Sequence, residues 1–150
     1  MLTEVFGGTS FEVEFILGLL FSLVLGVIIG AEREFRGKVA GISTQCFVIA
    51  GAMLFTFISF KLDPKNPTTL AGQIITGVGF LGAGIILKSE GGKITNVTTA
   101  ASIWFSASIG MAIGFKWYLI AIISTIYAIL IPRIPSIKSS DKIKANNSRK

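Results

Sequence analysis

The sequence predicts an all-α fold, a polytopic membrane helix bundle of about five transmembrane helices. Of the 150 residues, 51% are hydrophobic and only 15% are charged, and the mean hydropathy is +0.73. These values are typical of membrane proteins rather than of soluble domains. We expect one transmembrane domain over residues 1–131, followed by a basic tail over residues 132–150.

The predicted helices are apolar segments that approach the length of about 20 residues needed to cross a bilayer. They cover residues 13–31, 42–60, 71–87, 100–115 and 117–131. The third and fifth are short, and little more than Lys116 separates the fourth from the fifth. These last two segments are therefore either separate spans or one long kinked helix. The N-terminus is acidic, unlike the basic start of a secretory signal, which predicts that the first segment is retained as a permanent helix.

Basic residues are distributed unevenly between the two predicted ends of the bundle. Of the 14 Lys and Arg residues, only Lys61, Lys65 and Lys116 follow the second and fourth segments, and all others follow the first, third and fifth. The positive-inside rule then predicts an external N-terminus and a cytoplasmic C-terminus. The tail from Pro132 is predicted to be disordered. It serves either as a solubilising determinant of topology or as an attractor of anionic lipid headgroups.

Small residues recur every four positions in two of the segments. The first segment carries Gly18, Ser22, Gly26 and Gly30, and the fourth carries Ser102, Ser106, Gly110 and Gly114. Residues four apart share a helical face, and faces of small residues let membrane helices approach closely. The stripes predict tight packing within the chain or, alternatively, a homo-oligomer such as a dimer.

The third segment is rich in glycine and has a polar end. It contains Gly77, Gly79, Gly82 and Gly84, and the polar pair Gln73 and Thr76 lies near its predicted outer end. The glycines literally match the pattern G-x-G-x-x-G, but that motif requires a preceding strand and a βαβ unit to bind a dinucleotide. We interpret them instead as residues for close helix packing or for a local break in the helix.

Composition argues against several function classes. The chain has no His and a single Cys, so neither a Ser-His-Asp nor a Cys-His nucleophile can be assembled. A multi-cysteine metal site is excluded for the same reason. The net charge of +6 is concentrated at the ends of apolar segments, which predicts contact with the lipid bilayer rather than with nucleic acid. We do not expect an enzyme.

A cluster of charged residues ends the first segment: Glu32, Arg33, Glu34, Arg36 and Lys38. Glu32 and Arg36 are four apart and are expected to pair on a helix. Ionisable residues at the edge of a membrane span suggest a functional site. The alternative is a solvated ion network at the membrane interface.

Further candidate polar residues lie around the fourth segment. Glu90 occupies a glycine-rich turn, and Asn96, Thr98 and Thr99 precede the helix, where Asn or Thr is expected to cap it. Mg²⁺ keeps most of its waters and takes one or two carboxylates, so weak Mg²⁺ binding by Glu32, Glu34 or Glu90 is compatible with the sequence. No cofactor is expected.

In order and spacing, these motifs resemble the MgtC/SapB family of bacterial inner-membrane proteins. The matching pieces are Gly30-Ala-Glu-Arg-Glu34, Arg36-Gly-Lys-x-Ala-Gly41, the run from Gln73 to Gly84, Thr98-Thr-Ala-Ala-Ser-Ile-Trp104, and Ile109-Gly110 with Gly114. The family usually has Gly-Leu-Arg-Thr-His where this chain has Gly41-Ile-Ser-Thr-Gln45, so a role for that cation or histidine is not carried over.

The resemblance implies a multi-pass protein of the inner membrane with five helices, linked to Mg²⁺ limitation, ion homeostasis and virulence. It also implies a modulator of a membrane partner, such as the proton-driven ATP synthase. Longer family members carry a soluble C-terminal domain, which we expect this chain to lack. The alternative function is transport of Mg²⁺ or another cation, but few ionisable residues lie within the predicted spans.

Overall fold

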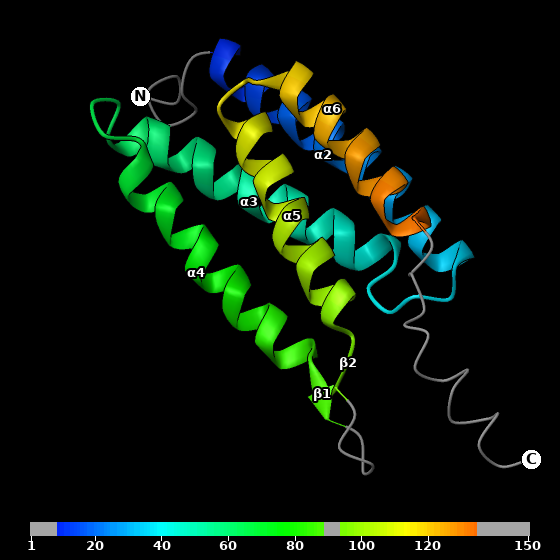
Figure 1. Ribbon diagram of the computed structural model, residues 1–150. Coiled ribbons are helices and arrows are strands. Elements are labelled where there is room, and N and C mark those ends of the chain that lie inside the picture. The colour runs from blue at the N-terminus through cyan, green and yellow to red at the C-terminus, as the bar shows by residue number, and fades with distance from the viewer. Residues whose placement is uncertain (1–8, 89–93, 135–150) are drawn as a thin grey trace, which may run out of the picture.

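The computed structural model describes residues 9–88 and 94–134 of the chain. Within these residues the chain forms a bundle of helices (Figure 1), which confirms the predicted all-α class. The helices are α2 (Thr9–Phe35), α3 (Ile42–Leu62), α4 (Thr68–Ile85), α5 (Val97–Gly114), α6 (Tyr118–Leu130) and the 3₁₀ helix η1 (Ile131–Arg133). Between α4 and α5, the two-residue strands β1 (Leu87–Lys88) and β2 (Ile94–Thr95) pair antiparallel.

Three of the described helices are long and apolar enough to cross a membrane. These spans are Phe11–Phe35, Ile42–Leu62 and Val97–Gly114. Two further apolar helices, Ala71–Ile85 and Tyr118–Arg133, are shorter, as the lengths of the third and fifth apolar segments predict. The bundle is therefore that of a membrane protein, whereas the side of the membrane on which each end lies stays a prediction.

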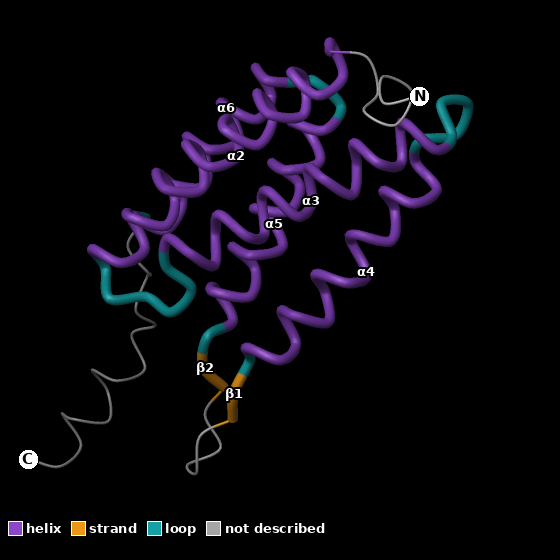
Figure 2. The backbone as a smooth tube through the Cα atoms, turned by 180° about the vertical axis from the view of Figure 1, so that it is seen from behind, coloured by secondary structure: helices purple, strands orange, loops and turns teal. Residues whose placement is uncertain are grey.

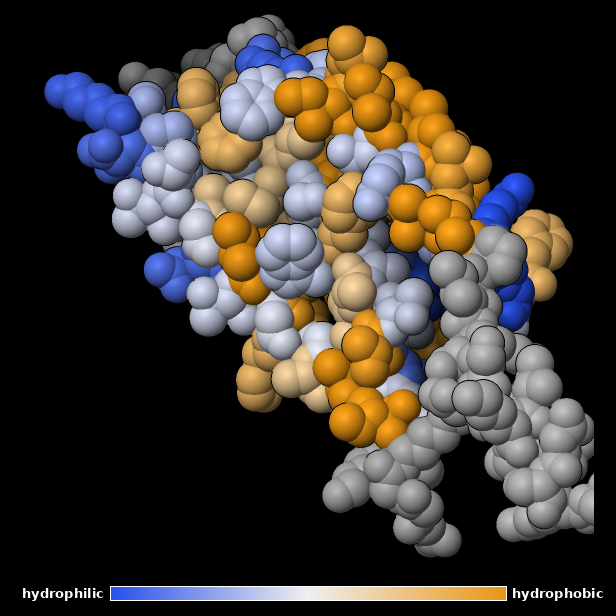
Figure 3. Space-filling view, viewed as in Figure 1, coloured by the Kyte–Doolittle hydropathy of each residue, from blue (hydrophilic) through white to orange (hydrophobic). Residues whose placement is uncertain are grey.

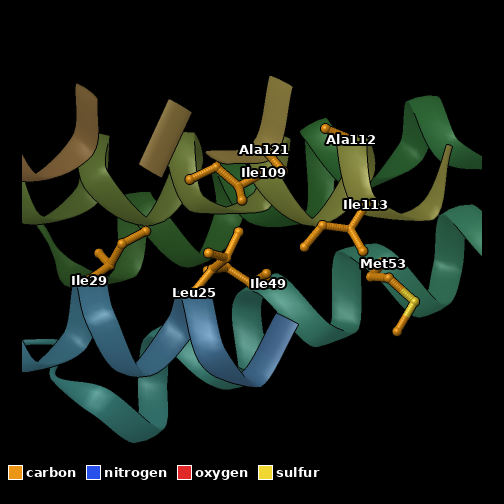
Figure 4. Packing of buried hydrophobic residues seen from close by; sticks show 8 residues of the cluster. All are labelled: Leu25, Ile29, Ile49, Met53, Ile109, Ala112, Ile113 and Ala121. Carbon is orange, nitrogen blue, oxygen red and sulfur yellow. The ribbon is translucent and has the colours of Figure 1, made fainter. Parts of the chain in front are cut away.

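The helices are arranged with α3 and α5 in the middle. In both views, α4 lies on one side of this pair and α2 and α6 lie on the other (Figures 1 and 2). The main core cluster joins Leu25 and Ile29 of α2 to Ile49 of α3 and to Ile109 and Ile113 of α5, and their side chains converge between the helices (Figure 4).

A tight turn separates α5 from α6, so the fourth and fifth apolar segments are two helices rather than one kinked helix. The N–H of Trp117 donates to the carbonyl of Ala112 at 2.8 Å, and the N–H of Lys116 donates to that of Ile113 at 2.8 Å. Lys116 adopts a φ of +64°. This pattern is a Schellman motif, which ends a helix and reverses the chain.

The glycines of the small-residue stripes on α2 and α5 face α3. A Cβ atom at Gly26 would lie 2.8 Å from the Cα of Cys46, and one at Gly30 would meet the backbone of Ile42. On α5, a Cβ at Gly110 would meet the carbonyl oxygen of Ile49. The helices approach so closely here that only hydrogen fits in place of a side chain.

The glycines of α4 behave differently. A Cβ at Gly82 would lie 3.6 Å from the Cβ of Ala100, but one at Gly77, Gly79 or Gly84 would meet no atom of the described chain within 4 Å. Close packing within the described chain is therefore wrong for these three residues, which are all exposed, and Gly77 lines an open groove between α3 and α4. The alternative of a broken helix is also wrong, since α4 runs continuously over Thr68–Ile85.

Charged groups mark the two ends of the bundle. At the end that carries the α5–α6 turn, Lys116 pairs with Glu14 at 2.7 Å, and the Lys61 ammonium lies 4.4 Å from the centre of the Phe11 ring. The opposite end carries the α2–α3 loop and η1. Figure 3 shows hydrophilic side chains toward the ends of the helices and largely pale or orange side chains between them.

Candidate functional site at the α2–α3 loop

Arg33 is the centre of the polar cluster at the end of α2. Only 3% of this residue is exposed. Its Nη2 donates to the hydroxyl of Thr99 at 2.9 Å and to the carbonyl of Val39 at 2.9 Å, and its Nε donates to the carbonyl of Ala40 at 3.1 Å. A buried guanidinium requires such acceptors, because an unpaired buried charge is costly.

The α2–α3 loop is shaped to supply these acceptors. α2 ends in a Schellman motif, in which Lys38 N–H donates to the Arg33 carbonyl at 3.0 Å and Gly37 N–H donates to the Glu34 carbonyl at 2.9 Å. Gly37 has a φ of +61°, which suits glycine. Ala40 has a φ of +66°, a conformation that costs a residue with a Cβ about 1–2 kcal/mol. The bonds from Arg33 to the loop carbonyls help to hold it there.

A second buried pair extends the network to the middle of the bundle. Gln45 of α3 is 0% exposed; its Nε2 donates to the Ala40 carbonyl at 3.3 Å, and its Oε1 accepts a hydrogen bond of 2.6 Å from Ser106 of α5. The Ala40 carbonyl is thus shared by Arg33 and Gln45. Together these residues join α2, the loop, α3 and α5 through polar contacts.

The two glutamates of the cluster have separate roles. Glu34 accepts a hydrogen bond from the N–H of Ile42 at 2.8 Å, so its carboxylate caps the start of α3, where helix N–H groups lack partners. Glu32 pairs with Arg36 at 3.3 Å, as its spacing predicts, and lies 3.7 Å from the Nε of Arg133 in η1.

These charged residues surround a cavity of about 890 Å³ at the loop end of the bundle. We call it the basic basin. Its walls are Glu32 and Arg33 of α2, loop residues 36–39, Ile94, residues 96–99 at the start of α5, and residues 131–134. Arg36, Lys38 and Arg133 are all exposed. The basin brings together parts of the chain about 100 residues apart, as Glu32 and Arg133 illustrate.

Several predicted residues lie elsewhere or act differently. Gln73 and Thr76 are exposed on α4, and Gln73 lines a groove between α3 and α4 rather than the basin. Asn96 occupies the N-cap position of α5, but its side chain makes no capping hydrogen bond and donates instead to the Ile85 carbonyl at 3.4 Å. Glu90 lies outside the described residues. Thr98 is exposed and lines the basin. The hydroxyl of Ser102 donates a hydrogen bond to the Thr99 carbonyl within α5.

The carboxylates near the α2–α3 loop are not arranged to bind Mg²⁺. In the part of the chain that the structure describes, no group of three or more His, Cys, Asp or Glu residues could hold a metal ion. Glu32 faces two arginines and Glu34 caps α3. Among the described residues near the loop, the cations around Glu32 and Glu34 would repel a divalent ion, so neither residue supports the weak Mg²⁺ site left open by the sequence.

Two members of the site were missed by sequence reasoning. In the sequence, Gln45 stands where the family has a histidine, and Arg133 belongs to the basic end of the chain. A polar amide inside an otherwise apolar segment is a usable signal for Gln45. No local signal exists for Arg133, because its pairing with Glu32 depends on how α6 packs beside α2.

Comparison with known proteins gives a consistent result. A family model described as MgtC family matches residues 19–136. Protein MgtC of Salmonella typhimurium (strain LT2) is 42% identical over 112 residues, which are 75% of this chain and 48% of the relative. Protein MgtC of Brucella abortus (strain 2308) is 40% identical over 111 residues, 73% of this chain and 46% of the relative. The chain thus spans about half the length of the curated relatives it matches. No solved structure matches it.

Proposed function

Because the chain belongs to the MgtC family, we propose that it is a multi-pass protein of the bacterial inner membrane that acts in adaptation to Mg²⁺ limitation and in virulence. We propose further that it modulates a membrane partner, with the proton-driven ATP synthase as one candidate, rather than carrying ions or catalysing a reaction. The basic basin is the proposed functional site.

The observation that carries the modulator role is the polar network around Arg33. Its side chain donates three hydrogen bonds, two to carbonyls of the α2–α3 loop and one to Thr99 of α5. Among the described residues, no buried side-chain nitrogen or oxygen lacks a hydrogen-bond partner. Such a network fixes the loop and the helix ends as one rigid surface, which suits recognition of a partner and offers no free acceptor ligands to a passing cation.

The central parts of the helices also favour a modulator over a transporter. No Asp, Glu, Lys or Arg occurs in residues 15–31, 42–60, 68–85, 97–114 or 118–130. Intramembrane ionisable residues usually mark ion and proton paths. The lack of charged groups through these segments leaves a cation without charged ligands across the bundle.

The test is growth at low Mg²⁺ of a bacterium that lacks its own relative of this protein and carries this chain instead. We expect wild type to restore growth and Glu32→Gln to fail at equal protein level in the membrane. Glu14→Gln is the matched control, since it removes a paired carboxylate at the opposite end of the bundle. Growth of the Glu32→Gln strain equal to wild type would refute the basin as the functional site.

Transport is tested separately in liposomes that contain a Mg²⁺-sensitive dye. We expect no Mg²⁺ flux from correctly inserted wild-type protein. Flux that Glu32→Gln removes would establish the transporter alternative and end the modulator proposal.

A further inference from the structure

The basic basin borders a second, largely apolar cavity. This cavity of about 300 Å³ lies between α5 and α6 and shares Arg33, Thr98, Ile131 and Pro132 with the basin. We call it the apolar cleft. Ile29, Trp104, Phe105 and Tyr127 are among its walls. A polar chamber at the end of the helices thus continues into an apolar cleft along them, and Arg33 stands where the two meet.

Arg33 has donor capacity left over. Its Nε and Nη2 are used by Ala40, Val39 and Thr99, whereas its Nη1 has no acceptor among the described residues. Because no fully buried side-chain nitrogen in that part of the chain lacks a partner, Nη1 is not completely enclosed, and Arg33 lines both cavities. An otherwise buried guanidinium therefore presents two unused N–H donors there.

The charge of the basin selects for an anion. Four described cations, Arg33, Arg36, Lys38 and Arg133, line it, and the one described carboxylate among its walls is that of Glu32. Glu32 is shared between Arg36 and Arg133, and Lys38 has no ion pair with any described residue. The first N–H groups of α5, which lie at the basin wall, add a weaker positive potential. Guanidinium groups bind phosphate oxygens especially well.

We propose that the basin and the apolar cleft form a binding site for an anionic phospholipid, with the lipid phosphate among the basic side chains and one acyl chain in the cleft. A free phosphate would use the basin alone. The continuity of the cleft with the basin at Arg33 favours the lipid, because a lipid joins an anionic group to an apolar chain. This lipid site goes beyond the proposed low-Mg²⁺ role and does not depend on it.

The experiment uses the full chain purified in mild detergent and measures lipid binding by native mass spectrometry. The probes are dioleoyl phosphatidylglycerol, the zwitterionic dioleoyl phosphatidylcholine, and water-soluble glycerol phosphate. Lys38→Gln/Arg133→Gln removes two basin cations while keeping Arg33 and the Glu32–Arg36 pair. Lys61→Gln/Lys65→Gln removes two cations at the opposite end and serves as the control.

We expect the basin double variant to bind phosphatidylglycerol about thirtyfold more weakly than wild type, in line with the contribution of two basic residues to anionic lipid binding, and the control to bind as wild type does. Equal weakening of both double variants would mean general charge attraction and overturn the proposal. Equal binding of the anionic and zwitterionic lipids would overturn it too.

The cleft is tested with Ala101→Leu, which fills it and leaves every cation in place, since Ala101 lines the cleft. We expect weaker phosphatidylglycerol binding from this variant. Unchanged binding would overturn the proposal even if the basin double variant failed to fold. Displacement of phosphatidylglycerol by an equal concentration of glycerol phosphate would identify a soluble phosphate as the ligand instead.

Discussion

The guanidinium of Arg33 donates a hydrogen bond of 2.9 Å to the hydroxyl of Thr99, a residue 66 positions away in the chain. This bond ties the end of α2 to the start of α5. It also supplies an acceptor to a cation that sits at the end of a membrane-crossing helix, where an unpaired charge is costly. The stability of the loop end of the bundle therefore depends on this pair.

We expect Thr99→Val to lower the free energy of unfolding by about 1.5–3 kcal/mol, the usual worth of a hydrogen bond to a charged group. Valine keeps the shape of threonine but removes the acceptor. The measurement is reversible unfolding of the purified protein in detergent. Thr98→Val is the control, because Thr98 is exposed; equal destabilisation by the two variants would contradict the assignment.

The buried pair of Gln45 and Ser106 predicts a non-additive result. Ser106→Ala should lower the free energy of unfolding by about 0.5–2 kcal/mol, since it leaves the Gln45 oxygen without its donor. In Gln45→Leu/Ser106→Ala both polar partners are gone, so we expect part of the loss to return. A double-mutant cycle measures this coupling, and strict additivity of the two single effects would argue against the bond.

Glycine substitutions should have opposite effects on two helices. Gly110→Ala places a methyl group against the backbone of α3, and we expect it to destabilise by about 1–3 kcal/mol through overpacking. Gly79→Ala meets no described atom and should stabilise the isolated chain by up to about 1 kcal/mol, because alanine is the better helix former. Thermal melts in detergent compare the two.

A loss of stability with Gly79→Ala, together with a change in particle size, would instead show that α4 packs against another molecule. Gly110→Leu extends the first test, since its larger side chain should prevent folding or assembly altogether.

The hydrogen bond of the Glu34 carboxylate predicts a graded loss of stability across two variants. Glu34→Ala removes the cap of α3 and should cost about 0.5–2 kcal/mol of stability. Glu34→Gln keeps an oxygen acceptor for the Ile42 N–H and should cost less. Denaturation curves of the three proteins give the order, and a glutamine variant as unstable as the alanine variant would show that charge, rather than the hydrogen bond, carries the effect.

Much of the fold follows from local pattern. The apolar segments correspond to α2–α6, although α2 extends beyond the expected residues 13–31 to Thr9–Phe35. The spacing of Glu32 and Arg36 predicts their ion pair. The four-residue spacing of the small residues predicts which helix faces pack closely. The structure places Gly26, Gly30 and Gly110 of these faces against α3. Periodicity is local information, so it can be read directly from the chain.

The candidate site was predictable only in part. The sequence gives no sign of which of the five charged residues from Glu32 to Lys38 is buried. In the structure Arg33 is buried, whereas Glu34, Arg36 and Lys38 are exposed. Burial depends on which helix covers each residue. Of these five residues, only Arg33 is bonded to α5, by its hydrogen bond to Thr99. The same reasoning explains why Gln73 and Thr76, despite their polar character, lie apart from the basin.

The sequence by itself determined the membrane class, the existence of the helices and the faces on which small residues allow close approach, because composition and spacing act over a few residues. Only the tertiary structure decided that Arg33, Thr99, Gln45 and Ser106 form one network and that Arg133 closes the basin beside Glu32. Those contacts join residues far apart in the chain, and they exist only once the helices have packed.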